Sequence, residues 1–284
     1  MDCFLFCLYI YCNSTTERVS SSFSTLCVYI RIVNHFIGRL NAHDICYKLF
    51  LLALPLERRI VMKRTTLRER LLPPYTKGEE LFNTISHIVG GGFGILALVV
   101  CVVFSALYRD VWSVVSSCIY GGSMVLLYTV SSVYHGLHPS LGKKVMQVID
   151  HCTIYLLIGG TYTPVALCAI RPYSSGWGWV LFGIVWGCAV IGATFTAIDL
   201  KKYAKLSMAC YIGMGWSVLL AVKPTVNSVE PMGLLWLLLG GISYTVGAVI
   251  YGLGKKHRYM HAVFHLFVLL GSMLQFISVL FYIL

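Results

Sequence analysis

The residues that could carry chemistry in this chain lie within its apolar stretches. The short sequence S-S-V-Y-H ends one apolar run, and it places Ser131 and His135 four positions apart. On a helix these two residues share one face, one turn apart. A second pair with the same spacing, His261 and His265, stands near the C-terminus, and Asp150 lies between the two pairs in the sequence. Three imidazoles, a carboxylate and a hydroxyl are the groups that a metal-dependent hydrolytic site uses.

Zinc is the metal that this set of side chains favours. Three histidine ligands leave one tetrahedral position open, which is typical of catalytic rather than structural zinc. Such a metal lowers the pKa of bound water towards 7 and polarises a carbonyl. We therefore expect His135, His261 and His265 to be ligands. Asp150 is expected to hold and deprotonate the water, and Ser131 to donate to the water or to a developing oxyanion.

A second polar row lies near the start of the first apolar segment, in E-L-F-N-T-I-S-H. Glu80, Asn83 and His87 fall at i, i+3 and i+7, which again is one helix face. One interpretation is a helix start with a cap-like carboxylate. Another is a hydrogen-bond network or a substrate gate that supports the metal site. His87 as a fourth metal ligand is a further alternative.

The composition indicates that these residues are held by membrane-spanning helices. The chain of 284 residues is 58% hydrophobic and only 12% charged, whereas a soluble domain carries about 25% charged residues. Windows of about 20 apolar residues recur, each long enough to cross a bilayer. The predicted fold is therefore all-α, a polytopic bundle of seven transmembrane helices. The expected segments are 81–107, 112–137, 147–170, 177–198, 204–222, 232–253 and 259–283.

The proline positions refine this prediction. Pro139, Pro172, Pro224 and Pro231 stand where connections are expected, as residues that end helices should. Pro164 instead falls inside the third segment, where it predicts a kink.

The basic residues indicate how the bundle is oriented. The net charge of +11 does not form one stripe or patch, so a nucleic-acid partner is not expected. Lys and Arg gather instead on alternate connections, namely in 57–77, 143–144, 201–205 and 255–258. The other connections carry only Arg109, Arg171 and Lys223. The positive-inside rule then predicts a cytosolic N-terminus and an outside C-terminus. It also places all five candidate residues of the metal site near the cytosolic face.

The cysteines predict no site of their own. The eleven cysteines are an odd number without a C-x-x-C pair, which indicates neither a disulfide framework nor a cysteine metal site.

The N-terminal part differs from the rest. Residues 1–61 mix short apolar pieces with polar residues, and none reaches spanning length. We interpret 1–61 as an atypical extension, 62–80 as a basic cytosolic leader beginning at Met62, and 81–284 as the transmembrane domain. A peripheral arm that lies on the membrane is the alternative for 1–61.

The combined motifs resemble the hemolysin III branch of the progestin and adiponectin receptor superfamily. Three patterns carry the resemblance: Glu80-x-x-Asn83-x-x-x-His87, Ser131-x-x-x-His135 followed by Asp150, and His261-x-x-x-His265. It covers about residues 75–284. The resemblance implies seven helices, a cytosolic N-terminus and zinc held by three histidines. It also implies kinship with membrane hydrolases that include alkaline ceramidases.

Three functions remain open at this point. The first is a zinc hydrolase in the cell membrane that acts on a lipid amide or ester arriving through the bilayer. The second is a cytolytic or channel-like protein, although the sequence shows neither an amphipathic hairpin nor a secretion signal. The third is a receptor-like sensor whose zinc is structural. The sequence leaves the substrate and the oligomeric state undetermined.

Overall fold

The structure is a computed structural model that describes residues 65–254 and 257–284. Contacts divide the chain into two units, Met1–Lys63 and Arg64–Leu284, and the described helices belong to the second. The interpretation of 1–61 as an extension, and of Met62 as the start of the leader, lies outside the described residues.

The predicted helical membrane fold is confirmed. In the described part of the chain, seven helical segments are long and apolar enough to cross a membrane. They are Lys77–Tyr108, Val111–Gly136, Leu141–Tyr173, Ser175–Ile198, Ala204–Ser228, Pro231–Leu253 and Met260–Ile283. The first, second, fourth and sixth of these segments are single α-helices, α4, α5, α8 and α11.

The other three segments change helix type along their length. The third consists of α6 (Leu141–Pro164), the π-helix η1 (Val165–Ile170) and α7 (Arg171–Tyr173). The fifth consists of α9 (Ala204–Gly215), the 3-10 helix η2 (Ser217–Ala221) and α10 (Val222–Ser228). The seventh consists of α12 (Met260–Ser278) and the π-helix η4 (Val279–Ile283).

A proline explains one of these changes, and two other prolines lie inside helices. Pro164 ends α6 directly before the π-helical turn, so the expected irregularity occurs at this residue as a change of helix type. Pro172 and Pro224 do not end their segments as predicted, because each lies inside a short helix. Both stand in the first turn, where the missing N–H has no partner within the helix to lose.

Local caps fix where the helices near the candidate site begin. The Thr76 side chain accepts from the main-chain N–H of Glu79, and the Glu79 carboxylate accepts from that of Thr76, which is a capping box at the start of α4. Asp110 caps α5, and Ser140 caps α6 by accepting from the main-chain N–H of Lys143. These caps set the register of the helices that carry the polar residues.

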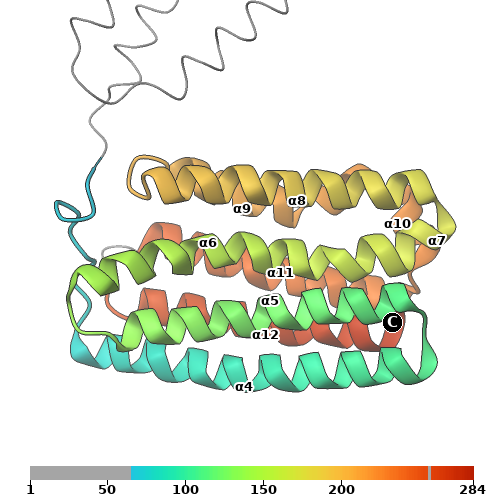
Figure 1. Cartoon of the computed structure of the whole chain (residues 1–284), viewed down its shortest axis with the longest axis horizontal. Helices are drawn as coiled ribbons and strands as arrows, with labels where there is room; N and C mark the ends of the chain where they lie inside the picture. The colour runs from blue at the N-terminus through green and yellow to red at the C-terminus, as the bar shows by residue number, and fades with distance from the viewer. Residues whose placement is uncertain (1–64, 255–256) are drawn as a thin grey trace, which may run out of the picture. The chain divides into compact units, whose positions relative to one another are not determined.

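The helices pack side by side with their axes aligned, and the chain direction reverses from each membrane-spanning segment to the next. The closest pairings are α4 with α5, α5 with α6, α6 with α8, α11 with α12, and α12 with α4. Figure 1 shows the helices running nearly parallel, with the C-terminus at one end of the bundle. At the opposite end, α4, α6 and α12 begin and α5 ends. We call this opposite end the histidine end.

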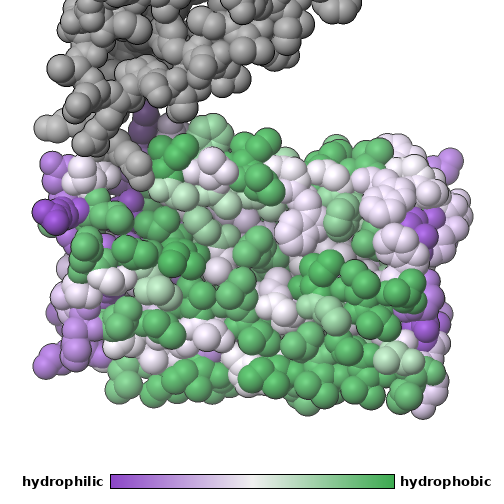
Figure 2. All heavy atoms as spheres, in the orientation of Figure 1, coloured by the Kyte–Doolittle hydropathy of each residue, from purple (hydrophilic) through white to green (hydrophobic). Residues whose placement is uncertain are grey.

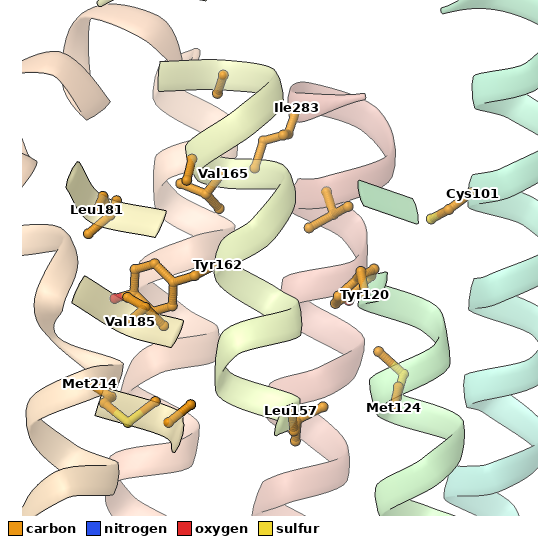
Figure 3. Packing of buried hydrophobic residues seen from close by; sticks show 14 of the residues in the cluster. Cys101, Tyr120, Met124, Leu157, Tyr162, Val165, Leu181, Val185, Met214 and Ile283 are labelled. Carbon is orange, nitrogen blue, oxygen red and sulfur yellow. The ribbon is translucent and has the colours of Figure 1, made fainter. Parts of the chain in front are cut away.

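Small residues let α4 and α5 approach closely. A Cβ atom on Gly90 would lie 2.5 Å from the ring of Tyr128, so only glycine fits there. Tyr128 is fully buried and its hydroxyl lies 2.7 Å from Ser272, which joins α5 to α12. Towards the other end, a buried apolar cluster that includes Tyr120, Tyr162 and Val165 fills the bundle (Figure 3).

The outer surface is apolar along the middle of the helices. Leu96, Val99 and Leu238 are among many large aliphatic side chains that are exposed. Figure 2 shows hydrophobic residues across the middle of one face, with hydrophilic residues at its two ends. This distribution suits helices in contact with lipid.

Candidate metal centre

Three histidines converge at the histidine end. His135 lies in the last turn of α5, and His261 and His265 occupy the first turns of α12. Each offers one ring nitrogen, and these nitrogens all lie within 4.8 Å of one another. The Nε2 atoms of His135 and His261 are 3.3 Å apart. Two imidazoles bound to one tetrahedral zinc at about 2.0–2.1 Å would have nitrogens about 3.3–3.4 Å apart. The spacing therefore fits a metal ion without rearrangement of that pair.

The surroundings of the three histidines add nothing to this fit. His135 and His265 are buried, and the Nδ1 atoms of His261 and His265 have no hydrogen-bond partner among the described residues. Buried polar groups without partners are costly. A cation held by Nε2 of His261 would not relieve this cost at Nδ1 of the same ring, so the fit to the predicted metal rests on the spacing of the three histidines.

Glu80 orients one of the candidate ligands. One oxygen of its carboxylate lies 2.7 Å from Nδ1 of His135, and the other accepts from Nζ of Lys143 at 2.8 Å. Because Nδ1 then carries the proton, the lone pair of Nε2 points towards the histidine cluster. A carboxylate that holds a histidine in this way is the usual partner of a metal ligand.

Asn83 and His87, the other two polar residues on the same face of α4 as Glu80, are also close to the histidines. Asn83 is fully buried, and its Nδ2 atom lies 3.5 Å from Nδ1 of His135. The His87 ring lies 3.8 Å from that of His265, centroid to centroid, and meets the edge of Tyr128. His87 is not in the group whose nitrogens converge, so the structure gives no support to a fourth imidazole ligand.

Asp150 and Ser131 lie beside the histidines on neighbouring helices. Both are buried, and both line the same cavity as His261 and His265. The Asp150 carboxylate also lies 3.8 Å from Nδ1 of His151, which is itself 2.8 Å from the carbonyl oxygen of Gln147. Asp150 is outside the group of converging ligand atoms. The structure thus places Asp150 on the cavity that His261 and His265 also line, but not among the converging atoms.

Two residues near the histidines were not identified from the sequence. Lys143 is buried and donates to Glu80 and to the carbonyl oxygens of His135 and Leu137. In the sequence it counted only as a charge on a connection. Tyr75 precedes the first helix and stacks on His261, with ring centroids 5.1 Å apart and an interplanar angle of 21°. Burial raises the pKa of Tyr75, so the phenol stays neutral. No periodic signal in the sequence marks either residue.

A cavity of about 150 Å³ extends from the histidines into the bundle. His261, His265, Asp150 and Ser131 line its one end, together with His87. Most of its remaining lining is apolar or aromatic and comes from α6, α9, α11 and α12, including Leu157, Ile212, Trp216, Ala248 and Val268. A polar end beside a long apolar wall suits an amphipathic molecule.

The site residues all lie in the part of the chain that has recognisable relatives. The sequence matches the family described as Haemolysin-III related over residues 75–276. Hemolysin-3 of Bacillus cereus is 40% identical over 206 residues, which cover 72% of this chain and 92% of that protein. The Hemolysin-3 homolog of Bacillus subtilis (strain 168) is 41% identical over 208 residues, which cover 73% and 96%. The human Monocyte to macrophage differentiation factor is 27% identical over 191 residues, which cover 64% and 76%.

Together the fold and the relatives define a multi-pass protein of the cell membrane with a cluster of histidines that could hold a metal ion. The chain belongs to the Haemolysin-III related family. The similarity to the human factor supports a place in the wider progestin and adiponectin receptor superfamily, as the sequence motifs indicated.

Proposed function

We propose that this protein is a zinc-dependent membrane hydrolase of a lipid amide or ester. The observation that carries the proposal is the convergence of three histidines, two of which, His261 and His265, line one end of an apolar cavity together with Asp150. Zinc at this position would supply a polarising charge for the scissile carbonyl and a water acidified towards neutral pH.

The protein's own residues would handle the proton. Asp150 would accept a proton from the attacking water as its oxygen adds to the carbonyl carbon, and would return it to the leaving nitrogen or oxygen as that bond breaks. Ser131, which lines the same cavity, would donate to the water or to the developing oxyanion. In our proposal Glu80 keeps His135 in the tautomer that binds metal.

The arrangement of the helices supports entry of the lipid from the bilayer. The cavity is lined by Gly215 on α9 and by Gly241 and Thr245 on α11. These two helices contact each other only sparsely compared with the neighbouring pairs. An acyl chain could pass between them while its head group reaches the histidines.

The charges at the ends of the bundle support a cytosolic position for the histidine end. Lys143 and Lys144 stand in the first turn of α6 at that end, and Lys201 and Lys202 on the connection between α8 and α9 at the same end. Arg109 and Arg171 stand at the other end. Lipid hydrolysis would then take place near the cytosolic leaflet.

The test combines metal content with turnover. Purified protein and its Asp150→Asn variant are assayed by elemental analysis and by fatty-acid release from a panel of lipid amides and esters. The amide of asparagine can still hold the water but cannot accept its proton, so the variant should keep about one zinc per chain and lose roughly 10²–10⁴-fold in rate. Undiminished activity in a fully metallated Asp150→Asn variant would contradict the proposal.

Two relatives named Hemolysin-3 or its homolog favour lysis as the second candidate function. A lytic protein should permeabilise vesicles, and its Asp150→Asn variant should permeabilise them equally well. If zinc is only structural in a sensor, the same variant keeps its signalling output, while His135→Ala destabilises the bundle.

A further inference from the structure

A buried carboxamide closes the end of the cavity away from the histidines. Gln275 lines the cavity and is 7% exposed. It lies ten residues after His265 in α12, a distance of about 15 Å along the axis at 1.5 Å per residue. The cavity therefore has a polar group at each end.

Two contacts fix the orientation of this carboxamide. Its Nε2 donates to the carbonyl oxygen of Leu237 at 3.0 Å, which the opposite amide orientation could not do. The side chain also packs on Gly240, where an added Cβ atom would lie 2.7 Å from Cγ of Gln275. The Oε1 atom is left buried and without a hydrogen-bond partner among the described residues.

Three other polar side chains that line this part of the cavity already have partners. Thr161 donates to the carbonyl oxygen of Leu157, and Tyr162 donates to that of Gly215. Thr245 donates to the carbonyl oxygen of Gly241 and accepts from the indole of Trp216. Gln275 therefore differs from these cavity-lining neighbours, because its acceptor faces no donor.

We propose that Gln275 is a specificity residue that accepts a hydrogen bond from a hydroxyl group on the acyl chain of the lipid. The inference rests on the proposed function in one respect, namely that the polar head of the lipid lies at the histidines. An unpaired buried acceptor is costly, and a ligand that supplies the donor gains more than one that leaves it unpaired. The preferred ligand is thus a hydroxylated acyl chain rather than a plain one.

The length of the cavity predicts where the hydroxyl must stand. Of the roughly 15 Å along α12, about 2 Å is taken by a metal–oxygen bond and about 2.8 Å by the hydrogen bond. The remaining distance of about 10 Å corresponds to roughly eight to ten carbons at about 1.25 Å per carbon, given C–C bonds of about 1.5 Å. A hydroxyl much nearer to the head, or much farther from it, would miss Gln275.

The experiment measures binding rather than turnover. Purified protein in lipid nanodiscs binds tritiated decanoic acid, which is displaced by unlabelled fatty acids of six to sixteen carbons with or without a terminal hydroxyl. In the wild type, the benefit of the hydroxyl should peak at about eight to ten carbons. In Gln275→Leu the affinity ratio of hydroxylated to plain acid should fall about tenfold. Partition of each fatty acid into the nanodisc lipid is the same for the wild type and for Gln275→Leu, so it cancels when their affinity ratios are compared.

A matched control lies at the same depth. Thr161→Val removes a hydroxyl that already donates within its own helix, so the ratio should not change. A ratio that falls in Thr161→Val but not in Gln275→Leu would overturn the proposal, because Thr161 would then be the recognising group. A hydroxyl that brings no benefit at any chain length would overturn it too, since Gln275 would then be satisfied by bound water.

The failures of the two proposals can be told apart. If Asp150→Asn keeps full activity, the hydrolase proposal is wrong, yet a Gln275-dependent ratio would still support the binding inference. If turnover follows the hydrolase prediction and the ratio is unaffected by Gln275→Leu, only the inference about Gln275 is wrong. Should Gln275→Leu fail to fold, the chain-length series on the wild type decides alone.

Discussion

The Nδ1 atom of His135 lies 2.7 Å from a carboxylate oxygen of Glu80, and this contact joins the end of α5 to the start of α4. The same carboxylate accepts from Lys143 at the start of α6. Three helices therefore meet at one candidate metal ligand through a single acid. The rigidity of the proposed site depends on this acid as well as on the three histidines.

Replacement of Glu80 by glutamine should weaken metal binding without removing it. The amide no longer offers a negative acceptor to the His135 N–H, and loss of such a partner lowers metal affinity about 10–100-fold. The measurement is zinc affinity by competition with a chromogenic chelator. Asp110→Asn, which changes an acid that caps α5 at the other end of the bundle, should leave the affinity unchanged. An equal loss in both variants would show that Glu80 has no specific role.

Replacement of Gly90 by alanine should destabilise the bundle. The new methyl group would lie 2.5 Å from the ring of Tyr128, and such overpacking costs about 1–3 kcal/mol. Gly92→Ala is the matched control in the same helix, because its Cβ would meet nothing within 4 Å. That variant should be neutral or slightly stabilising. Thermal unfolding of both variants measures the difference, and equal melting temperatures would contradict the packing described here.

Asp199 should make the stability of the folded protein depend on pH in the acid range. Burial raises the pKa of this carboxyl, but hydrogen bonds from the main-chain N–H groups of Lys202, Thr65 and Lys201 outweigh it and leave the pKa lowered. The stabilisation is therefore complete above the unfolded value of about 3.9 and is lost as the pH falls through the lower folded value. Below about pH 4, the melting temperature of the wild type should fall more steeply than that of Asp199→Asn. Parallel curves would contradict the prediction.

Much of the fold could be predicted because it depends on local properties of the sequence. Each span contains about 20 apolar residues, and the spacing of His261 and His265 already places both on one face of a helix. The three histidines could be grouped because their predicted depths agreed. These inferences need only helix geometry and hydropathy, and the structure brings the three imidazoles together.

The remaining features depend on contacts between distant residues. The pairing of Glu80 with His135 requires the rotation of α4 against α5, which no pattern within one helix specifies. Lys143 was assigned from the sequence to a charged connection, yet it stands in the first turn of α6, and its side chain is buried against the last carbonyl groups of α5. A helix accommodates Pro224 because η2 ends just before α10 begins, which puts the proline in the first turn of α10. Periodicity in the sequence does not predict this change from 3-10 helix to α-helix.

The orientation of the bundle is tested by two added cysteines. Gly142 lies at the histidine end and Gly176 at the opposite end, and at both positions a side chain has room. Because the basic connections lie at the histidine end, we expect Gly142→Cys to react with a membrane-impermeant maleimide only after the cells are permeabilised. Gly176→Cys should react on intact cells. The unaltered chain gives the background, and the reverse pattern would show that the histidine end faces outwards.

Removal of the metal should destabilise the wild type but not the histidine variants. A ligand that binds only the folded protein raises its stability, so a chelator should lower the melting temperature of the wild type. His135→Ala, His261→Ala and His265→Ala should each contain little zinc, because two imidazoles and water hold it poorly, and the chelator should then have no further effect. His151→Ala changes a histidine outside the converging group and should keep both the metal and the response to the chelator. Elemental analysis and thermal unfolding with and without chelator measure these outcomes. Full zinc content in the His265→Ala variant would show that the zinc is bound elsewhere.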